Sequence, residues 1–177
     1  ALSAPRTKEF AAILKAFRKV REAPCVTIAS INGYALGGGC ELALSCDFRL
    51  MADHTRIGLT ETRIGALAAA GGVQSLARVV GRARALQVAL LGDQLGAKEA
   101  LSVGLVTSVH PADELDAASE AFARRFLLCS PISVAETKRA LYRCETAGSE
   151  DADQIALDAV RAAAAGPEGW AGSAAFT

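Results

Sequence analysis

The sequence has little of what marks several common classes of protein. Its 177 residues include one Met, one Trp and two His, and 5% of them are aromatic. The 19 Lys and Arg balance 19 Asp and Glu, which disfavours a basic nucleic-acid-binding module. The longest apolar stretches, such as 66–70 and 85–91, fall well short of the roughly 20 residues that cross a bilayer, so we expect no membrane span.

Metal and disulfide frameworks are also missing from the pattern. The five cysteines include no C-x-x-C pair, and they stand at Cys25, Cys40, Cys46, Cys129 and Cys144. An odd number of cysteines in apolar stretches favours buried free thiols in a reducing compartment, so we expect a cytoplasmic protein. Neither histidine, His54 or His110, has neighbours at metal-ligand spacing, so we predict no metal site and place both on the surface.

What the sequence does have is the composition of one compact domain, with 51% hydrophobic residues and a mean hydropathy of +0.27. Ala1 stands where an initiator Met would, and no apolar signal segment follows it, so we expect a fragment of a longer chain. Periodic apolar residues predict a surface helix over 5–21. The β-branched run 25–31 predicts a strand buried on both faces.

The glycines of 37–39 then open a helix over 40–46, and a strand follows over 47–52. Strand, glycine turn, helix and strand make a βαβ unit, so we predict an α/β fold. Downstream, the pattern predicts one more strand over 105–110 and helices over 73–80, 82–91, 97–103, 112–128, 131–146 and 151–165. Apolar faces on these last helices suggest packing against other subunits, which divides the chain into a core over 1–110 and a helical oligomerisation region over 111–177.

Two glycine-rich turns, each at a helix start and each near a glutamate, carry the chemical information. The free N–H groups at such a turn can bind developing negative charge, so an N–H near Gly38 can form an oxyanion hole. The pattern matches neither a P-loop nor G-x-G-x-x-G, which disfavours nucleotide binding. Close packing of helix on strand explains the same glycines equally well.

The two glutamates are Glu41, in the first turn of the helix over 40–46, and Glu61, in a loop. Alone, Glu41 reads as a capping residue, and Glu61 as a surface acid or an ion-pair partner of Arg63 or Arg56. Together they can flank one substrate as general base and general acid. We interpret Asp47, at the start of the strand over 47–52, as a buried, hydrogen-bonded carboxylate that holds its turn.

The run A-S-I-N-G-Y-A-L-G-G-G-C-E-L-A over 29–43, continued by C-D-F-R over 46–49, resembles the signature of the enoyl-CoA hydratase (crotonase) family. Pieces downstream also fit in order, among them Glu61, Gly71-Gly72 and A-K-E-A over 97–100. The resemblance covers essentially the whole chain.

The resemblance implies a crotonase-like core of ββα repeats with a helical trimerisation region, hence a homotrimer or hexamer, acting on acyl-CoA. It gives Gly38 an oxyanion N–H, makes Glu41 the activator of water and makes Glu61 the proton donor to the α-carbon. Leu36, Gly37, Gly38 and Gly71 would line the substrate site. Coenzyme A is then the carrier of the substrate, and no cofactor is expected. Keeping both glutamates favours reversible hydration of a 2-enoyl-CoA.

The chain also departs from the family pattern. The N-terminal third is absent, and with it the loop that usually supplies a second oxyanion N–H. Residues 68–70 are alanines where the family usually has Pro-Gly, and Phe176 lacks the usual Glu-Lys-Arg continuation. These departures leave open an isomerase or dehydratase acting on a biosynthetic acyl thioester, and a non-catalytic crotonase-like scaffold.

Overall fold

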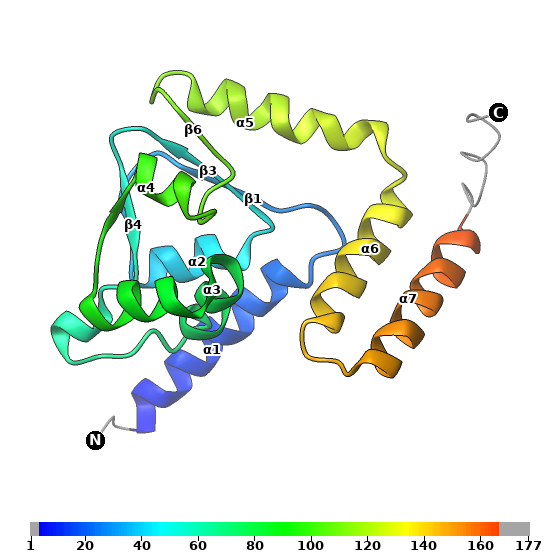
Figure 1. The fold of residues 1–177 in the computed structure, drawn as a ribbon, viewed down its shortest axis with the longest axis horizontal. Coiled ribbons are helices and arrows are strands. Elements are labelled where there is room, and N and C mark those ends of the chain that lie inside the picture. The colour runs from blue at the N-terminus through cyan, green and yellow to red at the C-terminus, as the bar shows by residue number, and fades with distance from the viewer. Residues whose placement is uncertain (1–3, 167–177) are drawn as a thin grey trace. The chain divides into compact units, whose positions relative to one another are not determined.

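The structure, a computed structural model, describes residues 4–166 (Figure 1). The chain divides into two units. The first comprises the chain up to Arg21 together with Thr27–Phe122, and the second comprises Glu22–Val26 together with the chain from Ala123. The division into a core over 1–110 and an oligomerisation region over 111–177 stays a prediction.

A three-stranded parallel sheet forms the frame of the first unit. Its strands are β1 (Ile28–Ile31), β3 (Phe48–Ala52) and β6 (Ser108–His110), in the order β1-β3-β6. Helix α2 (Gly38–Ser45) connects β1 to β3, so the predicted βαβ unit is confirmed. Figure 1 shows α2 beside the sheet, and α2 contacts both α1 (Ala4–Arg21) and α3 (Gly72–Leu91).

Successive side chains of β3 are buried on opposite faces of this sheet. Met51 belongs to the main core with Ile31, Leu44 and Leu76, on the side of α2 and α3. Leu50 and Ala52 pack with Leu115 of α5 (Leu115–Arg124) in a second cluster, where the rings of Phe48 and Phe122 meet edge to face at 5.0 Å. A parallel sheet buried on both faces is the expected arrangement for crossover helices.

Strand β1 does not share this burial, and here the prediction is wrong. Of its residues only Ile31 is buried, and Ser30 is exposed. The cause is its place in the sheet, since β1 is an edge strand that pairs with β3 on one side. The strand is also shorter than the predicted 25–31, because it begins at Ile28.

A second small sheet escapes the sequence pattern. It joins β2 (Ala35–Leu36), β4 (Arg56–Gly58) and β5 (Leu95–Gly96), with β2 parallel to β4 and β4 antiparallel to β5. Strands of two or three residues are too short to show hydrophobic alternation. Helix α3 includes both predicted helices, 73–80 and 82–91, which Gly81 separates with a φ of 75°.

Helices make up the rest of the first unit and most of the second. Helix α4 (Ala97–Ser102) precedes β6, and in the second unit α6 (Pro131–Cys144) packs against α7 (Ser149–Ala164). The predicted single helix over 112–128 is wrong in its length. The α-helix ends at Arg124, and a 3-10 turn, η2 (Arg125–Leu128), follows it. None of the helices described is both long and apolar enough to cross a membrane.

The hydrogen bonding of Asp47, just before β3, follows the sequence prediction, but the exposure of the cysteines does not. The carboxylate of Asp47 accepts hydrogen bonds from the N–H of Thr27 (2.8 Å) and from its hydroxyl (2.9 Å), so the predicted turn-holding role is confirmed, whereas the predicted burial is wrong because Asp47 is half-buried. All five cysteines are free, yet Cys25 and Cys129 are exposed, which corrects the prediction that the thiols are buried. Of the histidines, His54 is exposed as predicted, whereas His110 is half-buried and its Nε2 lies 2.8 Å from the Ser108 hydroxyl.

Close packing of β4 against the loop before β5 predicts that substitutions at two glycines change protein stability by different amounts. A Cβ at Gly58 would overlap the carbonyl oxygen of Asp93, whereas one at Gly96 would meet nothing within 4 Å. We expect Gly58→Ala to lower the free energy of unfolding by about 1–3 kcal/mol, as overpacking does. Urea unfolding measures it, with Gly96→Ala as the matched control. Equal effects of the two substitutions would contradict the packing described.

Candidate active site

The first glycine turn leads from β2 directly into α2. Gly37 adopts φ 55° and ψ −123°, and its N–H donates to the Gly58 carbonyl at 2.9 Å. The N–H of Glu41 donates to the Gly37 carbonyl at 3.0 Å, which closes the first turn of α2. Because Gly38 is the first residue of the helix, its N–H has no helical acceptor four residues back. This amide is therefore of the kind that binds an oxyanion.

Glu61 lies against that turn. It begins the 3-10 turn η1 (Glu61–Ile64), and its Oε1 is 3.3 Å from the position that a Cβ would take at Gly37. Its other oxygen, Oε2, is buried and has no hydrogen-bond partner among the described residues. The two predicted ion-pair partners of Glu61 interact with other groups. Arg63 forms an ion pair with Asp93 (3.5 Å), and Arg56 donates to the Gln94 carbonyl (3.3 Å).

Glu41 does not cap its own helix. Its residue is 5% exposed, and its Oε1 accepts hydrogen bonds from the N–H groups of Ala70 (2.8 Å) and Gly72 (3.0 Å). Those amides belong to the second glycine turn and to the start of α3, where the helix dipole favours a negative charge. The interpretation of Glu41 as a cap of α2 is therefore wrong, and the carboxylate instead joins two helices.

The second glycine turn leaves room for this carboxylate. A Cβ at Gly72 would lie 2.9 Å from both Cγ and Oε1 of Glu41 and 3.0 Å from the Cβ of Ala68. Gly71 is buried and adopts φ 107°, a conformation that favours glycine. Glycine is thus required at 71 by backbone conformation and at 72 by the approach of Glu41.

The charges of the two acids act on Cys40, and the charge of Glu61 acts on Glu41. Burial raises the pKa of Glu41, the N–H groups of Gly72 and Ala70 lower it, and the charge of Glu61 raises it. The pKa of Cys40 rises to about 12, mainly by burial and then through the charges of Glu61 and Glu41. The charge of Glu61 therefore acts on Glu41, and the pairing of the two acids across one substrate stays a prediction.

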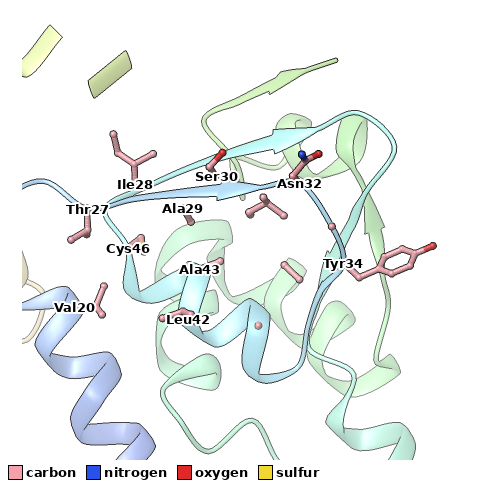
Figure 2. Close-up of a pocket in the computed structure, with 14 residues that line it drawn as sticks. Val20, Thr27, Ile28, Ala29, Ser30, Asn32, Tyr34, Leu42, Ala43 and Cys46 are labelled. Atoms are coloured by element: carbon pink, nitrogen blue, oxygen red, sulfur yellow. The ribbon is translucent and has the colours of Figure 1, made fainter. Parts of the chain in front are cut away.

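A hollow of about 610 Å³ lies on another side of α2 (Figure 2). It is lined by β1, the loop over 32–34 and residues of α2, including Leu42 and Ala43. Neither Glu41 nor Glu61 lines it, and the Tyr34 side chain projects outward from its rim. The acid pair and this hollow are consequently separate features.

The sequence predicted the residues of the site but not the backbone amides that hold Glu41. Leu36 is half-buried at the end of β2, Gly37 and Gly38 form the first turn, and Gly71 is the N-cap of α3. Missing from the prediction are the amides of Ala70 and Gly72, which hold Glu41. The glycine pair ahead of an apolar helix was the available signal, because such a helix start offers unpaired N–H groups.

Comparison with known proteins identifies the family. The model of the enoyl-CoA hydratase/isomerase family matches residues 4–164. The chain belongs to that family. It is 41% identical over 113 residues to an (E)-benzylidenesuccinyl-CoA hydratase of Thauera aromatica, covering 64% of this chain and 44% of the relative. It is 37% identical over 129 residues to a short-chain-enoyl-CoA hydratase of Clostridium acetobutylicum, covering 73% and 49%.

The fold comparison agrees with the family. An enoyl-CoA hydratase structure from Bacillus anthracis superposes with a TM-score of 0.92 at 32% identity, covering 99% of this chain and 69% of that one. The α/β fold is therefore crotonase-like. The family member described here spans about half the length of the curated relatives that it matches.

The raised pKa of Cys40 predicts a difference in thiol reactivity. A pKa of about 12 leaves the Cys40 thiol protonated at pH 8, and the side chain is buried. We expect maleimide at pH 8 to modify the exposed Cys25 and Cys129 and to leave Cys40 unmodified until the protein is denatured. Peptide mass spectrometry locates the adducts. Labelling of Cys40 in the folded protein at the rate of Cys25 would disprove this.

Burial of Glu41 predicts that its ionised carboxylate lowers the free energy of unfolding of the protein at neutral pH. Because its pKa is raised in the folded state, ionisation costs folding free energy above that pKa and costs nothing below the unfolded value of about 4.3. Glu41→Gln removes this cost and keeps an oxygen for the two amides. We expect its Tm to exceed that of wild type at pH 8 and the difference to shrink toward pH 4. A difference independent of pH would refute the assignment.

Proposed function

We propose that the protein is an enoyl-CoA hydratase-like lyase, which reversibly adds water across the double bond of a 2-enoyl-CoA thioester. The observation that carries the proposal is a pair of carboxyl groups that interact through their charges, one held by two backbone amides and the other lying against the glycine turn whose Gly38 amide is suited to an oxyanion. The hydratase names of both curated relatives support it.

In the proposed reaction the backbone stabilises charge and the side chains move protons. Glu41 takes a proton from water while the water oxygen bonds to the β-carbon, and the double-bond electrons move to the thioester oxygen. The Gly38 N–H stabilises that oxygen, a contribution of about 2.7–4 kcal/mol per donor in known enzymes. The enolate then re-forms the carbonyl as the α-carbon takes a proton from Glu61.

The contacts of Glu41 suit the base. Because two amides occupy Oε1, the other oxygen, Oε2, is left to meet water. Burial raises its pKa toward the working pH, which increases its strength as a base. The buried Oε2 of Glu61, which has no partner among the described residues, suits an acid that completes its hydrogen bonding on substrate or water.

The wider setting of the enzyme is part of the proposal. Coenzyme A serves as carrier of the substrate, with Leu36, Gly37 and Gly71 at the substrate site, and no cofactor or metal takes part. The free thiols fit a reducing compartment such as the cytoplasm. A homotrimer or hexamer would cover exposed apolar side chains of the second unit, Leu127 (77% exposed), Leu128 (92%) and Leu141 (67%).

The alanines of 68–70 favour a second candidate, a crotonase-superfamily isomerase or dehydratase acting on a biosynthetic acyl thioester. Ala68 and Ala70 are buried against the glycine turn, whereas Ala69 is exposed. Product analysis over a panel of enoyl and hydroxyacyl thioesters separates these reactions. A non-catalytic crotonase-like scaffold would bind a macromolecular partner and gain no thermal stability from acyl-CoA.

Substitution of either acid tests the hydration mechanism. Each of Glu41→Gln and Glu61→Gln removes one proton-transfer group, so we expect kcat on crotonyl-CoA to fall about 10²–10⁴-fold. Loss of absorbance of the enoyl thioester follows the rate. The exposed Glu114, replaced in Glu114→Gln, is the control and keeps the wild-type rate. Wild-type hydration by Glu41→Gln would defeat the proposal.

A further inference from the structure

Arg21 connects the first helix to the second glycine turn. It is the last residue of α1, it is half-buried, and its Nη2 donates to the hydroxyl of Ser75 at 2.9 Å. Ser75 is 7% exposed, and its own N–H donates to the Gly71 carbonyl at 3.0 Å. These two bonds tie the guanidinium to the first turn of α3.

The same guanidinium also packs directly on the turn. Its Nη2 lies 3.5 Å from the position that a Cβ would take at Gly71. The next residue, Gly72, faces Glu41, with its N–H bonded to Oε1 and its Cα too close for a side chain. Arg21 and Glu41 therefore contact neighbouring residues of one turn, Arg21 at Gly71 and Glu41 at Gly72.

Electrostatics does not explain this placement of a cation. The start of α3 carries the positive end of a helix dipole, which disfavours a guanidinium. The charge of Glu61 raises the pKa of Glu41, and Arg21 is not among the causes of that shift. What Arg21 supplies at this point is geometric, namely a planar donor group packed on a backbone that has no side chain at Gly71.

We propose that Arg21 is a positioning residue, which fixes the Gly71–Gly72 turn and so the amides that orient the Glu41 carboxylate. The inference rests on the proposed function for its catalytic consequence, but not for its structural one. Without Arg21 the turn can move, and misplacement of a catalytic group by about 1 Å costs up to about 10²-fold in rate.

Arg21→Met tests the proposal, since Met keeps much of the side-chain volume and loses the donors. Weaker amide bonds to Glu41 favour its protonated form, so we expect the carbon-13 NMR titration of the Glu41 carboxyl to move up by about half a pH unit. We also expect kcat on crotonyl-CoA to fall about tenfold, with KM changed less than about twofold. Ser75→Ala removes the acceptor and should act in the same direction, and it replaces Arg21→Met if that variant does not fold.

Arg18→Met is the matched control, because Arg18 is an exposed arginine in the same last turn of α1. It should leave both the titration and kcat unchanged. A merely structural role of Arg21 would lower Tm without moving the Glu41 titration, and that result overturns the proposal. If the wild-type protein hydrates no enoyl-CoA, the proposed function fails while the NMR titration still decides the role of Arg21.

Discussion

The site depends on one interaction, in which a single oxygen of Glu41 accepts hydrogen bonds from two backbone N–H groups. Glu41 belongs to α2, and the two amides belong to the turn that starts α3. The interaction satisfies donors that any helix start leaves unpaired, and it does so with a buried charge. It fixes the carboxylate relative to both glycine turns, so the geometry of the acid pair follows from the packing of two helices.

Glycine is what allows that packing. At Gly72 a side chain would occupy the space of the Glu41 carboxylate, and at Gly37 it would press on the carboxylate of Glu61. Each acid therefore lies against the backbone of a turn distant in sequence, Glu41 against the second and Glu61 against the first. The reciprocal arrangement explains why two glycine turns and two glutamates occur together in one short chain.

Several parts of this arrangement could be predicted from the sequence. The β-branched and apolar runs around Ile31 and Met51 gave the βαβ unit because buried parallel strands read as continuous apolar runs. The ladder β2-β4-β5 could not be predicted, since strands of two or three residues show no period. The edge position of β1 was also out of reach, because pairing order is a property of the whole sheet rather than of the strand.

The same limit applies to the site. The glycine turns and both glutamates could be found, because each lies in a recognisable local pattern, whereas the direction in which the Glu41 side chain points could not. A first-turn glutamate ordinarily favours its own helix start. Here Gly37 is the N-cap of α2, and the Glu41 side chain turns to the amides of α3 instead.

That choice has a thermodynamic consequence. Burial and the charge of Glu61 oppose the ionisation of Glu41 and raise its pKa, and a buried Glu61 oxygen lacks a partner in the described part of the chain. A ligand or water that donates a hydrogen bond to these carboxyl groups would lower both costs. An arrangement that is unfavourable for the free fold would in that case favour binding, and functional sites commonly lower the stability of their scaffold in this way.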